Sequence, residues 1–161
     1  MKLNELISKF EYSSNHPKEM MEGYLKAGKK VIGAFPVYTP EEIVHAAGMV
    51  PMGLWGGQVE IDKAKQYYPA FACSIIQSIA ELGLRGSSKG LSGVIIPCMC
   101  DTLICTTQNW KSGIKDIPMI PFVHPQNRKI EGGVTYLMTE YNHVKDELEK
   151  ICGHEISEEA M

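Results

Sequence analysis

Residues 31–55 read VIGAFPVYTPEEIVHAAGMVPMGLW, and this stretch decides the fold class. It opens with the short apolar run 31–35, continues with a helix-forming stretch over 40–47, and ends with a second apolar run over 50–55. Short apolar runs that alternate with helices are typical of a parallel sheet, because parallel strands need a crossover connection. The stretch therefore predicts a β–α–β unit.

The alternation continues toward the carboxyl end of the chain. A fourth strand is expected over 119–123, where Pro118 and Pro121 favour an edge position because proline cannot donate to a sheet ladder. The predicted fold class is α/β, a Rossmann-like parallel sheet of about four strands with flanking helices. The other expected elements are a helix over 72–84, a strand over 94–96 and a helix over 102–111.

Helices are also expected before and after this alternation. Apolar residues recur at helical spacing in 3–10 and again in 17–27, which predicts amino-terminal helices packing on the core. Seven apolar residues between Val134 and Ile151 lie on one face of a long last helix. We interpret residues 1–161 as a single α/β domain, comprising a helical lead-in over 1–29, an α/β core over 30–152, and a closing segment over 153–161.

Composition limits the class of protein. The chain has 161 residues, of which 44% are hydrophobic and 22% charged, as expected for one globular domain. The net charge of −3 is spread without a basic cluster, so neither nucleic acid nor a membrane is expected as a partner. No signal peptide or membrane-spanning run is found, which favours the cytoplasm. The five cysteines are then better interpreted as thiols or metal ligands than as disulfides.

The beginning of the helix over 40–47 carries a capping pattern. In Thr39-Pro40-Glu41-Glu42, Thr39 is at the expected N-cap, Pro40 at the first helical position, and Glu42 three residues after the cap. The sequence thus predicts that the Thr39 hydroxyl caps this helix.

Candidate chemistry lies at the carboxyl ends of the strands, where open parallel sheets bind their ligands. Cys73 opens one predicted helix and Cys100 precedes another, and a helix amino terminus stabilises a thiolate. Two such thiolates suit an iron–sulfur site, but from the residues alone Cys73 is better interpreted as a small buried apolar residue. Cys105 and Cys152 fit core or surface thiols, and Cys98 is expected to point away from Cys100 if the strand extends that far. The histidines lack zinc-site spacing, and no glycine-rich nucleotide-binding turn is present.

Two segments carry a family resemblance. One runs from Phe35 to Pro51 and contains PEEI, AAG and the closing proline, and the other contains Pro97-Cys98-Met99-Cys100-Asp101. Both resemble the 2-hydroxyacyl-CoA dehydratase and benzoyl-CoA reductase subunit family, specifically its amino-terminal domain. The segment around Cys73 is similar to the place of that family's earlier cysteine ligand, and the resemblance covers roughly residues 30–123.

The resemblance implies that the core over 30–152 binds a [4Fe–4S] cluster, with Cys73 and Cys100 as ligands. It also implies a third cysteine from a later domain that is absent from this chain and whose start is expected over 153–161. It also implies that an ATP-dependent activator protein delivers one electron to the cluster. The cluster passes this electron to the thioester of a 2-hydroxyacyl-CoA, so that water is eliminated to give an enoyl-CoA. Tyr38 and Thr39 would then lie near the open iron and donate hydrogen bonds in catalysis, although Tyr38 packing and Thr39 capping are the simpler alternatives.

The expected partners are therefore an acyl-CoA substrate, a partner dehydratase subunit and the activator, in anaerobic metabolism. A reductase of the same family, either benzoyl-CoA reductase-like or a double-cubane protein, is an alternative. A non-catalytic remnant or interaction domain is another. We expect the isolated chain to fold without metal, to be inactive as an enzyme, and to lose a reconstituted cluster quickly.

Overall fold

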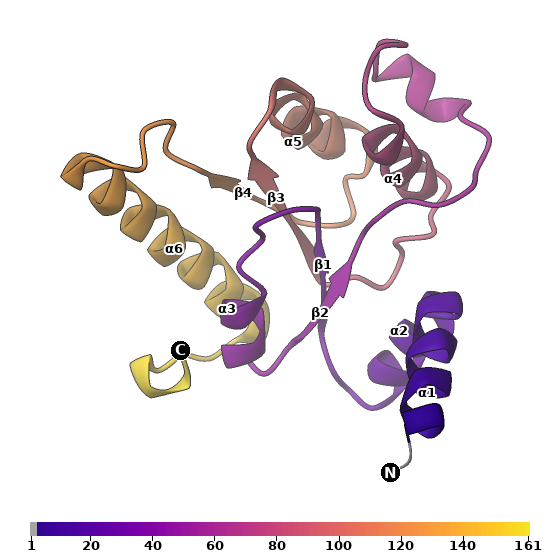
Figure 1. Ribbon diagram of the computed structural model, residues 1–161, viewed down its shortest axis with the longest axis horizontal. Coiled ribbons are helices and arrows are strands. Elements are labelled where there is room, and N and C mark those ends of the chain that lie inside the picture. Colours follow the sequence, from indigo (N-terminus) through magenta and orange to yellow (C-terminus); the bar gives the residue numbers. More distant parts are fainter. Residues whose placement is uncertain (1–2) are drawn as a thin grey trace.

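The computed structural model describes residues 3–161, and its elements follow the predicted alternation (Figure 1). The strands are β1 (Val31–Ala34), β2 (Val50–Gly53), β3 (Gly93–Cys98) and β4 (Met119–Val123). The helices are α1 (Leu3–Asn15), α2 (Pro17–Lys26), α3 (Glu41–Ala46), α4 (Ser74–Leu84), α5 (Asp101–Gly113) and α6 (Glu131–Cys152). Short 3₁₀ turns lie at Lys63–Gln66 and Glu158–Ala160.

The four strands form one sheet in the order β2-β1-β3-β4, and every neighbouring pair is parallel. This confirms the predicted α/β class and the edge position of β4. Because β1 leads outward to β2 and β3 leads outward to β4 in the opposite direction, the order reverses between β1 and β3. Such a reversal is the topological switch point at which open α/β sheets bind ligands.

Each face of the sheet is covered by a pair of helices. Helices α4 and α5 lie side by side on one face, and α3 and α6 lie on the other (Figure 1). The strand residues divide accordingly, since Val94 and Ile96 join the cluster under α4 and α5, whereas Ile95 joins the cluster under α3 and α6. Strand side chains alternate between faces, so each strand must be apolar on both sides, which explains the continuous apolar runs in the sequence.

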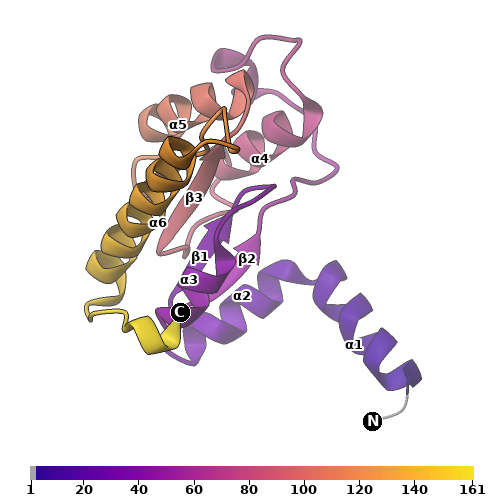
Figure 2. The ribbon, with the colours of Figure 1, turned by 60° about the vertical axis from the view of Figure 1, so that its left-hand side comes forward.

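The amino-terminal helices depart from their prediction. Both were expected to pack on the core, but α1 has no buried residue, and Met21 is the buried residue of α2. Figure 2 shows α1 standing away from the sheet and α2 running back toward it. The expectation is therefore wrong for α1. Residues 1 and 2 of the predicted lead-in lie outside the described residues.

The last helix is only half covered by the sheet. On its predicted apolar face, Val144 and Leu148 are buried, whereas Val134 and Met138 are more than half exposed. The tail after α6 folds back, because Ile156 is buried in the cluster under α3 and α6 and its N–H donates to Glu149 Oε1 at 2.8 Å. That a further domain begins over 153–161 stays a prediction.

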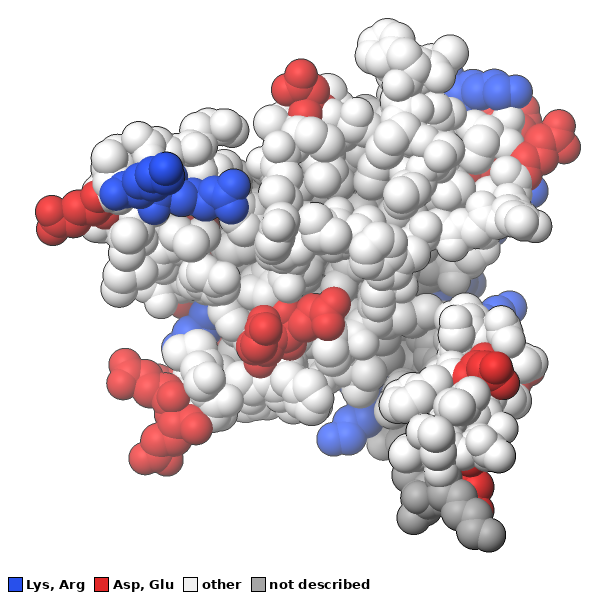
Figure 3. Space-filling model, in the orientation of Figure 1, with Lys and Arg blue, Asp and Glu red and all other residues white. Residues whose placement is uncertain are grey.

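The sequence predicted neither a basic surface patch nor a membrane-spanning helix. In the view of Figure 3, lysine and arginine side chains are scattered among acidic ones and form no continuous basic patch on that face. Within residues 3–161, none of the helices has the length and apolar character required to span a bilayer.

Candidate functional site

The switch point places two chain segments at the carboxyl edge of the sheet. After β1 the chain turns through residues 35–40 toward α3, and after β3 it turns through Met99 and Cys100 toward α5. β1 and β3 are parallel hydrogen-bonded neighbours, so both turns leave the same edge of the sheet, with β3 extending beyond the last pair, Ala34 and Ile95, to Cys98. The candidate site is built around them.

Cys73 and Cys100 occupy equivalent positions in the fold. Each is the N-cap residue of its helix, α4 for Cys73 and α5 for Cys100, each has an extended backbone, and each is an exposed free thiol. Both positions are at the carboxyl edge, because α4 and α5 run back toward the amino ends of the strands. The interpretation of Cys73 as a buried apolar residue is therefore wrong.

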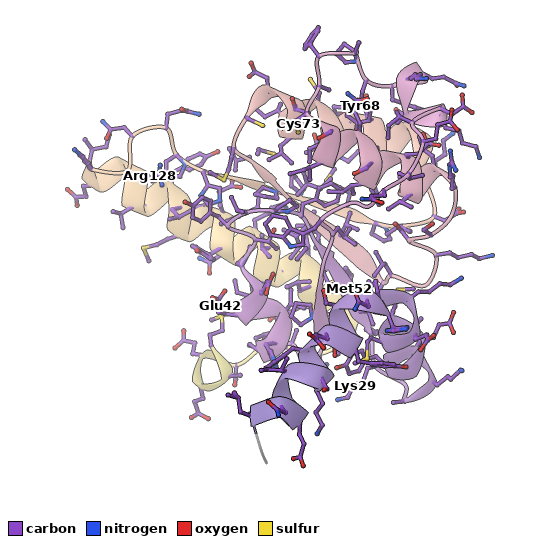
Figure 4. All side chains as sticks on the ribbon, turned by 45° about the vertical axis from the view of Figure 1, so that its right-hand side comes forward. Lys29, Glu42, Met52, Tyr68, Cys73 and Arg128 are labelled. Carbon is purple, nitrogen blue, oxygen red and sulfur yellow. The ribbon has the colours of Figure 1, made fainter. Side chains whose placement is uncertain are left out.

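The same core cluster underlies both cysteines. Ala72, directly before Cys73, is buried in the cluster under α4 and α5, and Met99, directly before Cys100, packs against that cluster. Figure 4 shows Cys73 close to Tyr68 on the long connection between β2 and α4. Tyr68 is itself buried in the cluster, so this connection is held against the core on its way to Cys73.

Hydrogen bonds from α5 fix the connection just ahead of Cys73. Asn109 Nδ2 donates to the carbonyl oxygen of Tyr67 at 2.9 Å. Burial raises the pKa of Tyr68, and hydrogen bonds with Thr106 and Asn109 partly offset this rise. Helix α5, which begins after Cys100, therefore also holds the segment that leads into Cys73.

A buried carboxylate anchors the connection at its other end. Glu81 on α4 is fully buried, and its Oε2 accepts hydrogen bonds from the N–H groups of Ala64 at 2.8 Å and Asp62 at 3.0 Å. Its Oε1 accepts a bond from Arg85 Nε at 2.6 Å, and Arg85 also donates to the carbonyl oxygen of Glu60. Burial alone would raise the pKa of Glu81, but these hydrogen bonds outweigh it and lower the pKa to about 2.

The remaining cysteines are less suited to metal binding. Cys98 is the last residue of β3, and burial raises the pKa of its thiol, which disfavours the thiolate that a metal needs. Cys105 lies exposed within α5, and the Cys152 thiol donates to the carbonyl oxygen of His154 at 3.1 Å. No group of three or more His, Cys, Asp or Glu side chains in the described part of the chain is arranged to hold a metal ion. Cys73 and Cys100 thus fit a cluster as two of its thiolates, and a complete set needs a further donor.

Thr39 does not cap the helix as predicted. Helix α3 begins at Glu41 with Pro40 as its N-cap residue and without a side-chain cap. The Thr39 hydroxyl instead donates to the carbonyl oxygen of Phe35 at 2.7 Å, closing the turn that follows β1. The helix thus starts one residue later than predicted, and Thr39 lies outside it. Because its single donor is used, Thr39 can only accept a further hydrogen bond without breaking this turn.

Tyr38 lies in the same turn with an unusual backbone. Its φ is +66°, the left-handed region, and its side chain is 62% exposed. The ring packs edge-on against His124, which follows β4, at a centroid distance of 5.9 Å. Sequence reasoning gave His124 no role in the site, although its place directly after a strand at the carboxyl edge was a signal for one.

Known proteins resemble this chain over nearly its full length. Residues 36–161 match the family model described as 2-hydroxyglutaryl-CoA dehydratase, D-component. The chain is 45% identical over 164 residues to the (R)-2-hydroxyglutaryl-CoA dehydratase beta subunit of Acidaminococcus fermentans, covering 100% of this chain and 43% of that protein. It is 44% identical over 162 residues to the lactoyl-CoA dehydratase beta subunit of Anaerotignum propionicum, covering 99% of this chain and 42% of that protein.

A more distant relative belongs to a reductase. The chain is 34% identical over 135 residues to a benzoyl-CoA reductase subunit of Thauera aromatica, covering 83% of this chain and 35% of that protein. The chain therefore spans less than half the length of each of these relatives.

Proposed function

Because the chain belongs to the 2-hydroxyglutaryl-CoA dehydratase, D-component family, we propose that it is the amino-terminal, cluster-binding part of a 2-hydroxyacyl-CoA dehydratase subunit. In this proposal Cys73 and Cys100 are two of the ligands of a [4Fe–4S] cluster. The whole enzyme would eliminate water from a 2-hydroxyacyl-CoA to give an enoyl-CoA.

The observation that carries the proposal is the equivalent placement of the two thiols. Both stand exposed at helix amino termini, where the partial positive charge of the helix favours the thiolate form. Both also flank one core cluster at the edge where this fold binds ligands. Iron–sulfur clusters are held mostly by cysteine thiolates, so these two thiols fit as part of a cluster's ligand set.

The cluster, when bound, supplies single electrons to the thioester of the substrate. The residues of this chain have positioning tasks around it. The Tyr38 hydroxyl, on an exposed side chain in the turn after β1, is a free donor for the thioester oxygen or the 2-hydroxyl group. The Thr39 hydroxyl, already bonded to Phe35, closes the turn that carries Tyr38 and keeps only its acceptor capacity for a ligand.

A dehydratase is favoured over a reductase of the family. Identity is 45% and 44% to the two dehydratase beta subunits but 34% to the benzoyl-CoA reductase subunit. A partner dehydratase subunit follows from the names of those relatives. An ATP-dependent activator protein and a cytoplasmic location complete the proposal.

Anaerobic reconstitution of the chain with iron and sulfide tests the ligand assignment. We expect visible absorbance that disappears on desalting, because two thiolates leave two irons without protein ligands. Cys73→Ser and Cys100→Ser should each reduce iron uptake, whereas Cys105→Ser, which alters an exposed thiol in the middle of α5, serves as the matched control. Equal uptake by all three variants would rule out the assignment. About four irons per chain that survive desalting would show that the site is complete here.

A further inference from the structure

The imidazole of His124 joins two distant segments at the carboxyl edge. Its ring packs edge-on against Phe122, the buried residue two positions earlier in β4, with centroids 4.5 Å apart. Its other contact is the ring of Tyr38 at 5.9 Å. Since β3 lies between β1 and β4 in the sheet, His124 reaches the turn after β1 across the end of β3.

Tyr38 needs such support. Tyr38 is the single non-glycine residue with a positive φ among the described residues. In this conformation the side chain is strained against its own backbone. Residues keep such a conformation only when their surroundings determine it. The Tyr38 side chain is mostly exposed, and its ring contact is with His124. This contact therefore supplies a large part of the packing that keeps Tyr38 in its conformation.

The polar atoms of His124 give an independent second observation. Its Nε2 is the one buried side-chain nitrogen or oxygen without a hydrogen-bond partner in the described part of the chain. Native proteins rarely leave a buried polar atom unpaired, and an exception calls for a reason. Burial lowers the pKa of His124, and a hydrogen bond with the backbone of Tyr38 opposes this shift. The His124 ring thus interacts with both the backbone and the side chain of Tyr38.

From these contacts we infer that His124 is a positioning residue, whose imidazole ring holds Tyr38 in its left-handed turn over the switch point. This assigns His124 the task of presenting the Tyr38 hydroxyl to the ligand. The role of that hydroxyl rests on the proposed function, but the holding contact does not. The tests below need neither cluster nor substrate, so their failure is distinguishable from failure of the iron assignment.

Chymotrypsin cleavage of the reduced, cluster-free chain tests the holding contact. The enzyme cuts after tyrosine and phenylalanine, and Phe71, which is 91% exposed on the β2–α4 connection, gives an internal reference site on a different segment of the chain. His124→Ala should raise the rate of cleavage after Tyr38 at least tenfold relative to cleavage after Phe71. His143→Ala, which alters an exposed histidine of α6, should leave the ratio unchanged. An unchanged ratio in His124→Ala, or a parallel rise at both sites, would overturn the inference.

A reciprocal measurement covers the case in which His124→Ala fails to fold. Tyr38→Gly removes the ring but accepts a positive φ, so the turn is retained. Without that ring His124 is less buried, and its pKa, measured by proton NMR of the imidazole, should rise toward the ordinary value of 6.5. The nearby charges, Arg128 and Glu140, are the same in both proteins. A His124 pKa identical in wild type and Tyr38→Gly would show that the two residues are not coupled and would sink the inference.

Discussion

Replacing Glu81 with glutamine should destabilise the fold by about 3 kcal/mol. The Glu81 carboxylate is fully buried and accepts bonds from two backbone N–H groups and from Arg85. A hydrogen bond to a charged acceptor contributes about 1 kcal/mol more than one to a neutral acceptor, and glutamine also turns an N–H₂ group toward the guanidinium. The drop in the pKa of Glu81 from 4.5 to about 2 gives a similar figure, at about 1.4 kcal/mol per unit.

The pH dependence of this difference identifies its origin. The folded-state pKa of Glu81 is lower than the unfolded value, so its contribution is fully present above about pH 4.5 and is lost as the pH falls toward 2. Wild type and Glu81→Gln should therefore differ by a constant amount from pH 7 to about pH 5 and converge below pH 4.5.

Urea unfolding of the cluster-free chain, followed by circular dichroism at pH 7, 4.5 and 3, measures both effects. Glu147→Gln is the matched control, because Glu147 forms an ion pair with Lys150 on the exposed side of α6. It should leave the unfolding midpoint unchanged. A Glu81→Gln effect below about 0.5 kcal/mol, or one equally large at pH 3 and pH 7, would refute the reasoning.

Two further predictions concern the turns around the site. Gly133→Ala should cost about 1–3 kcal/mol, because a Cβ at Gly133 would collide with the backbone carbonyl of Asn127, whereas Gly132→Ala, with open space around it, should stabilise by about 0.5 kcal/mol. Equal midpoints in urea would contradict this contrast. Thr39→Val should cost about 1 kcal/mol through the lost bond to the Phe35 carbonyl, while Thr39→Ser keeps it, and matching stabilities of the two variants would count against that bond.

The sheet was predictable from the sequence because its central strands, β1 and β3, are buried on both faces. Such strands read as unbroken apolar runs, and each lies where a helix pattern stops. The register and the strand order were not predictable in this way, since they depend on which helices cover which face. Pro118 and Pro121 predicted an edge strand or a partly irregular one, because proline lacks the N–H group that a sheet ladder uses, and β4 does lie at the edge of the sheet.

The errors come from local patterns that the tertiary structure overrides. Thr39-Pro40-Glu41-Glu42 carries every residue of a capping box, but the Thr39 hydroxyl finds the Phe35 carbonyl instead, and the helix starts without it. The apolar stripe of α1 predicts burial, but periodicity does not say what covers a helix, and no residue of α1 is buried.

The two halves of the candidate site come from opposite faces of the sheet, and the double winding explains why. Cys73 and Cys100 begin α4 and α5 on one face, whereas Tyr38 lies in the turn that leads to α3 on the other. Both groups lie beyond the carboxyl ends of strands, at the edge where the winding reverses between β1 and β3. A ligand at this edge would have thiolates on one side and the Tyr38 hydroxyl on the other. The sequence motifs reveal each half separately, but the contact of His124 with Tyr38 exists only once β1, β3 and β4 are assembled, so it could be found only in the folded chain.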